Sequence, residues 1–504
     1  MSKMSQAGST DHSLTGRIAS GPSDVLIDEV LRPQFDYELA NLLPDYLLIE
    51  QALLAEYVRL EVLTADDARR IAGLLAAITP ELLMAKAALS MTDIAFAIET
   101  MVMQQLQPDV PRWHVDRSRN DLQACAQLMG GRRQLLMVAD GLRALIKTAI
   151  DLAGRTTHIP MPGYTHYQAA QVITPGFYFS AFAGQMLRSL EQLLAIYRVI
   201  NECPLGAGAL SGQDLPWDRE RLALLLGFER AQPHALPSVA SREWALRISA
   251  ELAILGTTLS RFVTDLLLWG SSGYGFIDLP DQLAGISSAM PQKKNFPVLE
   301  RIRGRTAHMS ALFVDLAMGQ RSTPFTNLVE VSKEAGANLM LQLMSARSTL
   351  RLLSLVLEHL RFREDRLRAA CEEEFFGGFR LANTLTLEYG LPYRRAQVLA
   401  GRYIMAAMER DLKPMDVDPS LLAEICAAEG YAVDMDSSTL QHIFAVETNV
   451  IEKQSAGSTS PPAVEELLKS QREQLRALEQ HLQERWSRLQ AVPEGIRTTL
   501  ELAQ

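Results

Sequence analysis

The stretch ASREWALRISAELAILGTTLSRFVTDLLLWG, residues 240–270, carries apolar side chains at alternating spacings of three and four residues. These positions are Ala245, Ile248, Leu252, Leu255, Leu259, Phe262, Leu266 and Trp269. Such spacing predicts one long helix with a continuous apolar stripe. Because Ile254, Val263 and Leu267 lie outside the stripe, the apolar surface is wider than a two-stranded coiled coil needs. We expect a bundle of several helices to bury both surfaces.

Four further stretches predict long helices, and little of the chain alternates as a strand would. They cover about residues 120–153, 177–201, 297–318 and 332–360. The chain is therefore mainly α. Segments rich in glycine and proline separate these helices, at 158–168, 202–218 and 270–292, and predict loops at the bundle ends. Loops on a rigid scaffold are where functional groups tend to sit.

The C-terminal part has shorter helical patterns, which indicate a separate small helical domain from about Asp365. A turn at Gly390 to Pro392 separates two of its helices. After the linker SAGSTSPP, apolar residues recur at near-heptad spacing and predict a final amphipathic helix that serves packing. These residues are Leu468, Leu475, Leu478, Leu482, Trp486 and Leu489.

The length of 504 residues is more than one compact core usually serves, so two to four structural units are expected. The formal net charge of −10 argues against nucleic acid or an anionic membrane as partner, although an anionic substrate would still need a local basic pocket. The four cysteines form no CxxC pair, so neither a zinc site nor a disulfide framework is indicated. With a polar N-terminus and no apolar run of membrane-spanning length, we expect a cytoplasmic protein with a loose N-terminus.

The first candidate site is HVDRSRNDLQ, which comes directly before a predicted long helix. Ser118 or Asn120 can cap that helix, whose free N–H groups and dipole favour an anion nearby. Arg117 and Arg119 beside the cap suggest carboxylate binding. The simpler interpretation is a helix cap with a solvated cluster of charges.

The second candidate is MPGYTHYQAAQ, where Thr165, His166 and Gln168 follow a Pro-Gly turn. Histidine is the side chain most easily poised for proton transfer near neutral pH. A hydrogen-bonded structural histidine is the alternative.

The third candidate is ISSAMPQKKN, residues 286–295. Ser287 and Ser288 supply hydroxyls, Lys293 and Lys294 supply charge, and Asn295 precedes a predicted helix with Pro297 in its first turn. A basic surface loop with an asparagine cap would explain Asn295 and one lysine. It would not explain two serines, a methionine and a proline in the same ten residues.

Taken together and in this order, these segments resemble the fumarase/aspartase superfamily of fumarate-releasing lyases, and in particular its argininosuccinate lyase branch. The signature G-S-S-x-M-P-x-K-x-N is matched by residues 286–295 except that Ile286 replaces its first glycine. The branch motifs R-S-R-N-D, G-Y-T-H-x-Q-x-A-Q and P-L-G-x-G-A-L-x-G match residues 117–121, 163–171 and 204–212. The resemblance covers nearly the whole chain, from about Thr15 to the GSTSP at Gly457.

The resemblance implies a mainly α subunit of three domains, with a long central bundle that forms a twenty-helix core in a homotetramer. We place the N-terminal helical domain at residues 1–115, the central bundle with the signature loop at 116–364, and the small C-terminal domain with the final helix at 365–504. Each active site would draw its motifs from three subunits. The implied reaction removes an amine from an N-substituted aspartate, a small dicarboxylate, and releases fumarate reversibly, with no metal or cofactor.

The resemblance also implies the catalytic residues. Ser287 corresponds to the general base, carried on a mobile loop that closes over the substrate. Lys293 and Asn295 correspond to the groups that hold the extra negative charge of the intermediate. His166 corresponds to the residue that gives a proton to the departing nitrogen, and Glu300 to the acid that orients it.

Four further residues match succinyl-binding positions of the family, namely Ser118, Arg119, Asn120 and Thr165. Their donors would account for two substrate carboxylates, and they explain a cationic pocket in an anionic protein.

One segment departs from the branch. Where argininosuccinate lyases usually have S-T-Y-N-K-D-L-Q-E-D-K, this chain has STPFTNLVEVS, so Pro324, Val329 and Ser332 replace a tyrosine, a glutamine and a lysine that help hold the arginine part. Ala95 likewise replaces the histidine of D-I-H. Lost hydrogen bonds of this kind can cost orders of magnitude in selectivity. We therefore expect another N-substituted aspartate as substrate, with genuine argininosuccinate lyase as the alternative.

A structural, catalytically silent protein is a further alternative, because this branch includes lens crystallins. Such a protein would be expected to lose the base or the acid, yet Ser287, His166 and Glu300 are all present. Ile286 is the main departure in the signature loop. A β-branched residue does not readily take the positive φ angles open to glycine, so the loop is expected to close differently.

Overall fold

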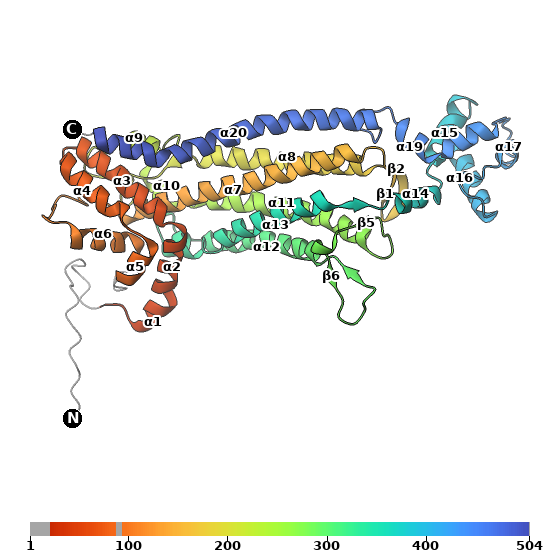
Figure 1. The fold of residues 1–504 in the computed structure, drawn as a ribbon. Coiled ribbons are helices and arrows are strands. Elements are labelled where there is room, and N and C mark those ends of the chain that lie inside the picture. The colour runs from red at the N-terminus through yellow and green to blue at the C-terminus, as the bar shows by residue number, and fades with distance from the viewer. Residues whose placement is uncertain (1–20, 87–92, 503–504) are drawn as a thin grey trace.

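The computed structural model describes residues 21–86 and 93–502, so the N-terminus that we expect to be loose lies outside the described residues. The molecule is elongated (Figure 1). Short N-terminal helices gather at one end, a bundle of long helices forms the middle, and a group of short helices forms the other end (Figure 1). The prediction of a mainly α chain is confirmed.

The elements follow the loops and periodicities of the sequence. The N-terminal helices are α1 (Asp24–Leu26), η1 (Ile27–Leu31), α2 (Arg32–Asn41), α3 (Leu43–Arg59), α4 (Ala65–Ala76), α5 (Pro80–Lys86) and α6 (Ile94–Gln105). The central helices are α7 (Arg119–Arg155), α8 (Pro175–Ile200), α9 (Arg219–Leu225), α10 (Ala235–Ala240), α11 (Glu243–Gly270), η2 (Asp281–Leu283), α12 (Pro297–Gln320), η3 (Glu330–Glu334) and α13 (Leu339–His359). The remaining helices are α14 (Glu364–Glu372), α15 (Gly378–Leu387), α16 (Tyr393–Glu409), α17 (Pro419–Ala427), α18 (Ser437–Phe444), α19 (Val446–Ile451) and α20 (Pro461–Leu502).

The strands are short and pair only in twos within the described residues. They are β1 (Met161–Thr165) with β2 (Gln168–Ile173), β3 (Glu202–Cys203) with β4 (Arg230–Ala231), β5 (Ile277–Asp278) with β8 (Arg361–Phe362), and β6 (Gly285–Ile286) with β7 (Lys294–Asn295). The β3–β4 pair is parallel and the other three are antiparallel. They tie loops together at the ends of the bundle.

The longest of the central helices is α7, with 37 residues and Ser118 as its N-cap. At about 1.5 Å per residue it spans about 55 Å. Its glycines allow close packing, because a Cβ added to Gly131 would lie only 2.3 Å from the nearest atom of the Trp244 indole. Arg132, fully buried, fastens α7 to the end of α9 by donating to the carbonyls of Leu226 and Gly227.

Helix α11 confirms the prediction from its apolar stripe. Seven of the eight stripe positions are buried and Phe262 is partly buried, packed against the same core. Of the apolar residues outside the stripe, Val263 is buried, but Ile254 remains 59% exposed. The expectation that the bundle buries both surfaces is therefore wrong for a single chain, because one side of α11 faces outward.

By length and composition alone, α11 could cross a membrane, and it is the one such helix in the described part of the chain. A core helix of a water-soluble bundle passes the same test. Here α11 packs along α12 and also contacts α8 and α13. Its apolar stripe is therefore used for packing between helices.

The helix predicted from residue 332 begins later, so that boundary is wrong. The chain first forms the π-helical turn η3, then turns through residues 335–338, and α13 starts at Leu339. Gly336 lies in this turn, and glycine weakens a continuous α-helix at that point. This irregular segment lies at the end of the bundle near the N-terminal helices (Figure 1).

The final helix runs back along the whole bundle (Figure 1) and contacts α7, α8 and α3. It buries Leu468, Leu475 and Leu482, as its near-heptad spacing predicts. One hydrophobic core joins the N-terminal helices, the bundle and α20, whereas a second core lies within residues 381–444. Among those short helices, α15 and α16 flank Gly390, which has a φ of +73° as the predicted turn requires.

Candidate active site

The N-terminus of α7 holds the first candidate group. The Ser118 hydroxyl accepts from Asn120 N at 3.2 Å, so Ser118 is the cap, and Asn120 donates its amide to Ala209 O at 3.0 Å. Arg119 is exposed, donates to Asp93 at 2.9 Å and lies over the Phe96 ring. One guanidinium and one amide therefore stand beside the free N–H groups of a long helix, an arrangement that favours a carboxylate.

Arg117 is not free for this purpose, so the suggestion that both arginines are available to a ligand carboxylate is wrong for Arg117. Its side chain is buried and forms a bidentate ion pair with buried Glu50. Burial acts to lower the pKa of Arg117, but Glu50 outweighs it and the net pKa is raised. Next to it, burial and the Arg117 charge lower the pKa of His114 to about 2, so this histidine stays neutral.

Asp121, which follows Asn120, fixes the loop that carries the motif PLGAGALSG. Its buried carboxylate accepts from Gly206 N at 2.9 Å and from Gly208 N at 3.1 Å. Both glycines have left-handed backbones, and a Cβ on Gly208 would lie 2.4 Å from Gly212 O. Burial raises the pKa of Asp121 to about 6, against the opposing effect of these hydrogen bonds.

The second candidate group lies on the β1–β2 hairpin. Thr165 and Gln168 pair at its tip, and the two residues between them, His166 and Tyr167, both have positive φ angles of 53° and 64°. This is the twist that a two-residue hairpin turn needs, usually supplied by asparagine or glycine. The turn leaves Thr165 and His166 exposed, and Tyr167 is 83% exposed.

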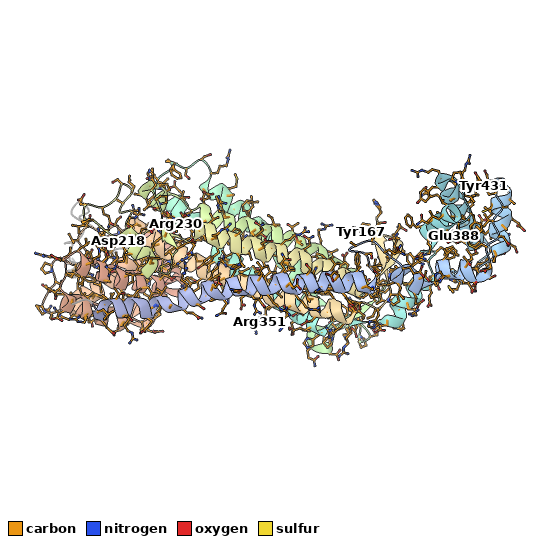
Figure 2. The ribbon with its side chains drawn as sticks, turned by 90° about the horizontal axis from the view of Figure 1, so that it is seen from above. Tyr167, Asp218, Arg230, Arg351, Glu388 and Tyr431 are labelled. Atoms are coloured by element: carbon orange, nitrogen blue, oxygen red, sulfur yellow. The ribbon has the colours of Figure 1, made fainter. Side chains whose placement is uncertain are left out.

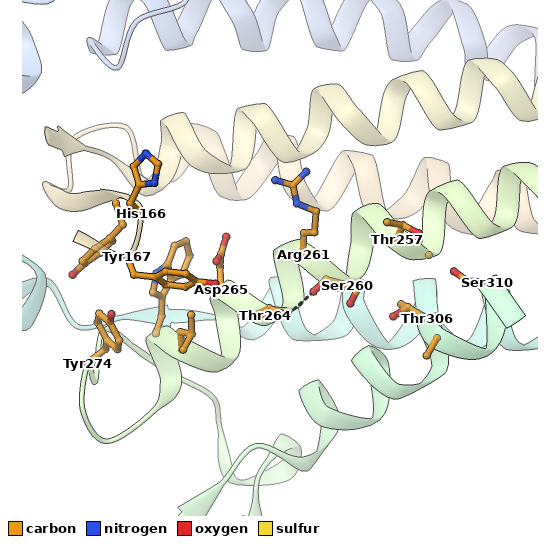
Figure 3. Close-up of a pocket in the computed structure, with 15 residues that line it drawn as sticks. His166, Tyr167, Thr257, Ser260, Arg261, Thr264, Asp265, Tyr274, Thr306 and Ser310 are labelled. Carbon is orange, nitrogen blue, oxygen red and sulfur yellow. Dashed lines mark hydrogen bonds between the residues drawn. The ribbon is translucent and has the colours of Figure 1, made fainter. Parts of the chain in front are cut away.

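A surface cavity of about 590 Å³ lies beside this turn. Figure 3 shows His166 and Tyr167 on one side of it and Arg261 and Asp265 of α11 on the other. Asp265 accepts a hydrogen bond of 2.6 Å from the Tyr178 hydroxyl, so it is already engaged inside the chain.

The third candidate group lies on the β6–β7 hairpin, which projects from the bundle (Figure 1). Its loop folds locally: the Ser287 hydroxyl accepts from Met290 N at 3.1 Å. Lys294 pairs with Asp278 and Asp281, both at 3.1 Å, whereas Lys293 is exposed with no ion pair to any described residue. The two adjacent lysines therefore differ, and Lys293 is the available charge.

Residues on either side of this loop complete the group. Ile286 is 94% exposed and lies in β6 with an extended backbone, so the position does not require the positive φ of a glycine here. Asn295 lies in β7 and is not the cap of α12, which is Phe296. Pro297 occupies the first turn as predicted, and Glu300, exposed, follows in that turn.

One chain does not bring the three groups together. Ser118, Arg119 and Asn120 begin α7, whereas His166 follows its end, so the 37 residues of α7 separate them by about 55 Å. Figure 2 shows Tyr167 near the C-terminal helices and Asp218 at the opposite end, among the N-terminal helices. In the described residues, no hydrogen bond or ion pair joins His166 to Glu300 or to Ser287.

The chain also resembles known proteins over most of its length. A profile of the protein family described as Lyase matches residues 87–309. An argininosuccinate lyase of Aquifex aeolicus is 32% identical over 357 residues, which cover 70% of this chain and 77% of that protein. One of Thiobacillus denitrificans is 32% identical over 408 residues, covering 80% of this chain and 87% of that protein.

The chain belongs to the argininosuccinate lyase family. It is a carbon–nitrogen lyase of the fumarase/aspartase superfamily, as its motifs predict. A solved structure of EDDS lyase in complex with formate shares the fold with a TM-score of 0.83 and 21% identity, covering 96% of this chain and 97% of that chain. A class II fumarase from Schistosoma mansoni gives a TM-score of 0.66 and 15% identity, covering 83% and 92%.

No cluster of three His, Cys, Asp or Glu side chains that could hold a metal ion occurs in the described parts of this lyase. The four cysteines are free and buried. The sulfurs of Cys125 and Cys203 lie 3.9 Å apart, and burial raises the pKa of Cys125 well above its usual value, so this thiol is inert.

Sequence reasoning missed two residues that organise the α7 end. Asp121 is the last residue of the R-S-R-N-D motif, which gave it no individual role. Asp93 is the first residue of the DIA segment, in which only Ala95 attracted attention. No local signal identified the role of Asp121, because its partners Gly206 and Gly208 lie 85 and 87 residues further along the chain. Asp93 caps α6 through Phe96 N and holds Arg119.

We predict that the wild type becomes less stable to unfolding as pH rises, and that the Asp121→Asn variant does not show this decrease. Because burial raises the pKa of Asp121 from 3.8 to about 6, the folded chain binds this proton more tightly than the unfolded chain. The stabilisation is complete below the unfolded pKa and is lost as pH rises through about 6, by up to about 3 kcal/mol. Urea midpoints on both sides of this window measure it.

The matched control is Asp151→Asn, at an exposed position of the same helix. It should keep the pH dependence of the wild type. The same dependence in Asp121→Asn and wild type would contradict the prediction.

Proposed function

We propose that this lyase removes an amine from an N-substituted aspartate to release fumarate, with Ser287 as general base, in a cytoplasmic homotetramer with shared active sites. The observation that carries the proposal is the placement of the three groups. They match family motifs residue by residue, yet one chain holds them at opposite ends of a helix about 55 Å long. Copies packed side by side in antiparallel orientation would bring them together.

Apolar residues on the outer faces of the bundle support assembly. Ile254 on α11, Val314 and Met318 on α12, and Leu341 and Met344 on α13 are each more than half exposed. Large apolar side chains gathered over three neighbouring helices indicate a surface that a partner covers. A closed symmetric arrangement of identical chains would bury the same patch on each of them.

The chemistry explains the residue types at the β6–β7 end. A proton beside a carboxylate is barely acidic, so its removal requires donors that hold the extra charge on that carboxylate. Lys293, exposed and free of any ion pair to a described residue, and Asn295 would supply these donors. Ser287 takes the proton, and it acts as a base only where the closed loop excludes water.

His166 and Glu300 would handle the departing amine. His166 stands on a turn that projects its imidazole outward, where it can reach the substrate in a neighbouring chain. Glu300 in the first turn of α12 would come from a further chain, orient the imidazole and favour its charged form. The C–N bond breaks as the nitrogen takes this proton.

The α7 end would bind the succinyl part. Ser118, Arg119, Asn120 and, from the hairpin, Thr165 supply donors for two carboxylates. The Arg119–Asp93 pair keeps this guanidinium in place while the site is empty. Substrate carboxylates would then share Arg119 with Asp93, so the cation need not be reorganised on binding.

We predict that Ser287→Ala lowers fumarate formation by more than about a hundredfold, the range expected for loss of a general base. The fold should be unchanged, because among the described residues the hydroxyl accepts a single local hydrogen bond, from Met290. Fumarate release is followed by absorbance, and assembly by light scattering. Ser288→Ala is the matched control and should stay active. An active Ser287→Ala enzyme would contradict the role of the base.

Mixing two inactive variants tests the shared sites. Ser287→Ala and Arg119→Gln change opposite ends of the bundle, so copies of both in one tetramer leave about a quarter of the sites intact. We expect fumarate formation to return after unfolding and refolding the two together, and not after refolding either one alone. If the mixture stays inactive, each site is built from one chain.

The amine is expected to differ from arginine, because Pro324, Val329 and Ser332 remove the polar contacts to that part. We predict turnover of argininosuccinate well below roughly ten per second, a common rate for metabolic enzymes. Incubating fumarate with a panel of amines and weighing the adducts identifies the preferred amine. Rapid turnover of argininosuccinate would instead favour a genuine argininosuccinate lyase.

A further inference from the structure

A cavity of about 310 Å³ lies near the α7 end, between α2, α7, the start of α11, η3 and α13. This volume is at the small end of the range for ligand pockets, so it suits one small molecule. Its lining includes Ser332 and Val331 of η3, within the segment where the chain departs from its family. The structure therefore places the altered segment against an open space.

Most of the cavity wall is apolar. Side chains from α11, η3, α13 and the junction of α2 with α3 make this wall, namely Leu42, Trp244, Val331, Leu339, Met340 and Leu343. The one buried acid of the lining, Glu38, is engaged, because it accepts from Lys333 Nζ at 3.3 Å and from Ile94 N at 3.4 Å. An apolar chain would fill most of this space without leaving a charge unpaired.

Arg242 also lines the cavity, and it is only 4% exposed. Its Nε donates to Gln127 Oε1 at 2.9 Å and its Nη1 donates to the carbonyls of Val239 and Ser241, but its Nη2 has no partner. Among the described residues no carboxylate pairs with it. Burial lowers the pKa of Arg242 to about 10, so it keeps its charge near neutral pH.

A buried guanidinium with no counter-charge is costly unless an anion joins it. Gln127 fixes the position of Arg242, since the same amide donates to Ser332 O at 2.6 Å. In the family segment quoted above, aspartate stands at the position of Val331, so this chain has an apolar side chain in the cavity where the segment has an acid. An anion that pairs with Arg242 would then come from outside the described chain.

The cavity adjoins the proposed succinyl site. Arg119 pairs with Asp93, the next residue Ile94 donates to Glu38, and Glu38 lines the cavity. Along α7, Gln127 lies seven residues beyond Asn120, which corresponds to about 10 Å. A group bound by Arg242 would therefore be several bonds from a nitrogen attached to the succinyl part.

Resting on the proposed function, we propose that this cavity holds the leaving amine and that this amine carries a carboxylate at the far end of an apolar chain. Arg242 would bind that carboxylate, and the walls around Trp244 and Met340 would cover the chain. The substrate class is thus an aspartate whose nitrogen bears an ω-carboxyalkyl group. Elimination breaks the C–N bond, the adjacent carbon loses a proton, and the products are fumarate and an ω-amino acid.

Two amines of equal chain length test the carboxylate: ε-aminocaproate and n-hexylamine. Each is added to fumarate with the full-length enzyme, and kcat/KM for adduct formation is compared. We expect ε-aminocaproate to be preferred at least tenfold, and glycine, which is too short to reach Arg242, to react poorly. Equal rates for the two amines of equal length would overturn the inference.

Two variants of one wall residue form the matched pair. Val331→Asp places a carboxylate in the cavity that competes for Arg242, whereas Val331→Asn has the same shape without the charge. We expect the preference for ε-aminocaproate over n-hexylamine to fall at least tenfold in Val331→Asp and to stay within threefold in Val331→Asn. Circular dichroism and light scattering confirm that each variant is folded and assembled, and equal effects of the two substitutions would contradict the role of Arg242.

Direct binding separates this inference from the proposed function. Calorimetry with ε-aminocaproate uses wild-type enzyme saturated with succinate, which cannot react. If ε-aminocaproate binds the wild type but not Val331→Asp, the cavity is supported as an amine-binding site even when no adduct forms. The proposed reaction would then be the part that is wrong. Adducts with n-hexylamine together with no measurable binding of ε-aminocaproate would leave the reaction standing and overturn the inference.

Discussion

The length of α7 is the constraint on which the site depends. A straight helix of 37 residues holds its ends about 55 Å apart, and a packed core that includes Leu135, Leu142 and Ile146 keeps it from folding back. The groups that match family motifs are fixed to such ends, at the N-cap of α7, at the hairpin after it and at the start of α12. No side-chain movement closes that distance. Association of chains is the remaining way to unite them, and the exposed apolar residues of α11 to α13 are placed where it would occur.

Three buried arginines show how the chain treats cations in its interior. Arg117 has a full counter-charge in Glu50. Arg132 has none, but it donates to three carbonyl-type oxygens, one of them from Asn201, and lies on the Phe228 ring 3.4 Å from its centre. Arg242 has neither a carboxylate nor a full set of acceptors. Arg132 also leaves one nitrogen, Nε, without a partner, but its guanidinium lies on an aromatic ring, whereas Arg242 borders a cavity. The deficit at Arg242 therefore fits a position that a ligand completes.

The sequence was sufficient where short-range periodicity decides the structure. The stripe of α11, the Ser118 cap and Pro297 in the first turn of α12 all depend on residues within a few positions of one another. It was insufficient where the partner lies far along the chain. Glu50 is 67 residues from Arg117, and Gly206 is 85 residues from Asp121, so neither pairing could be read from local spacing. The exposure of Ile254 could not be predicted either, because periodicity gives the apolar faces of a helix and not how many of them one chain covers.

The turn that carries His166 shows why the exposed position is specific. Two consecutive residues with side chains, His166 and Tyr167, adopt the left-handed conformation, which costs about 1–2 kcal/mol for each. The β1–β2 ladder offsets this cost, because Val172 of β2 is buried in a small core with Cys371 and Phe376. A hairpin held so firmly could have carried asparagine and glycine at its tip without strain. Instead it holds an exposed imidazole beside a cavity, a placement that fits the proposed site shared between copies.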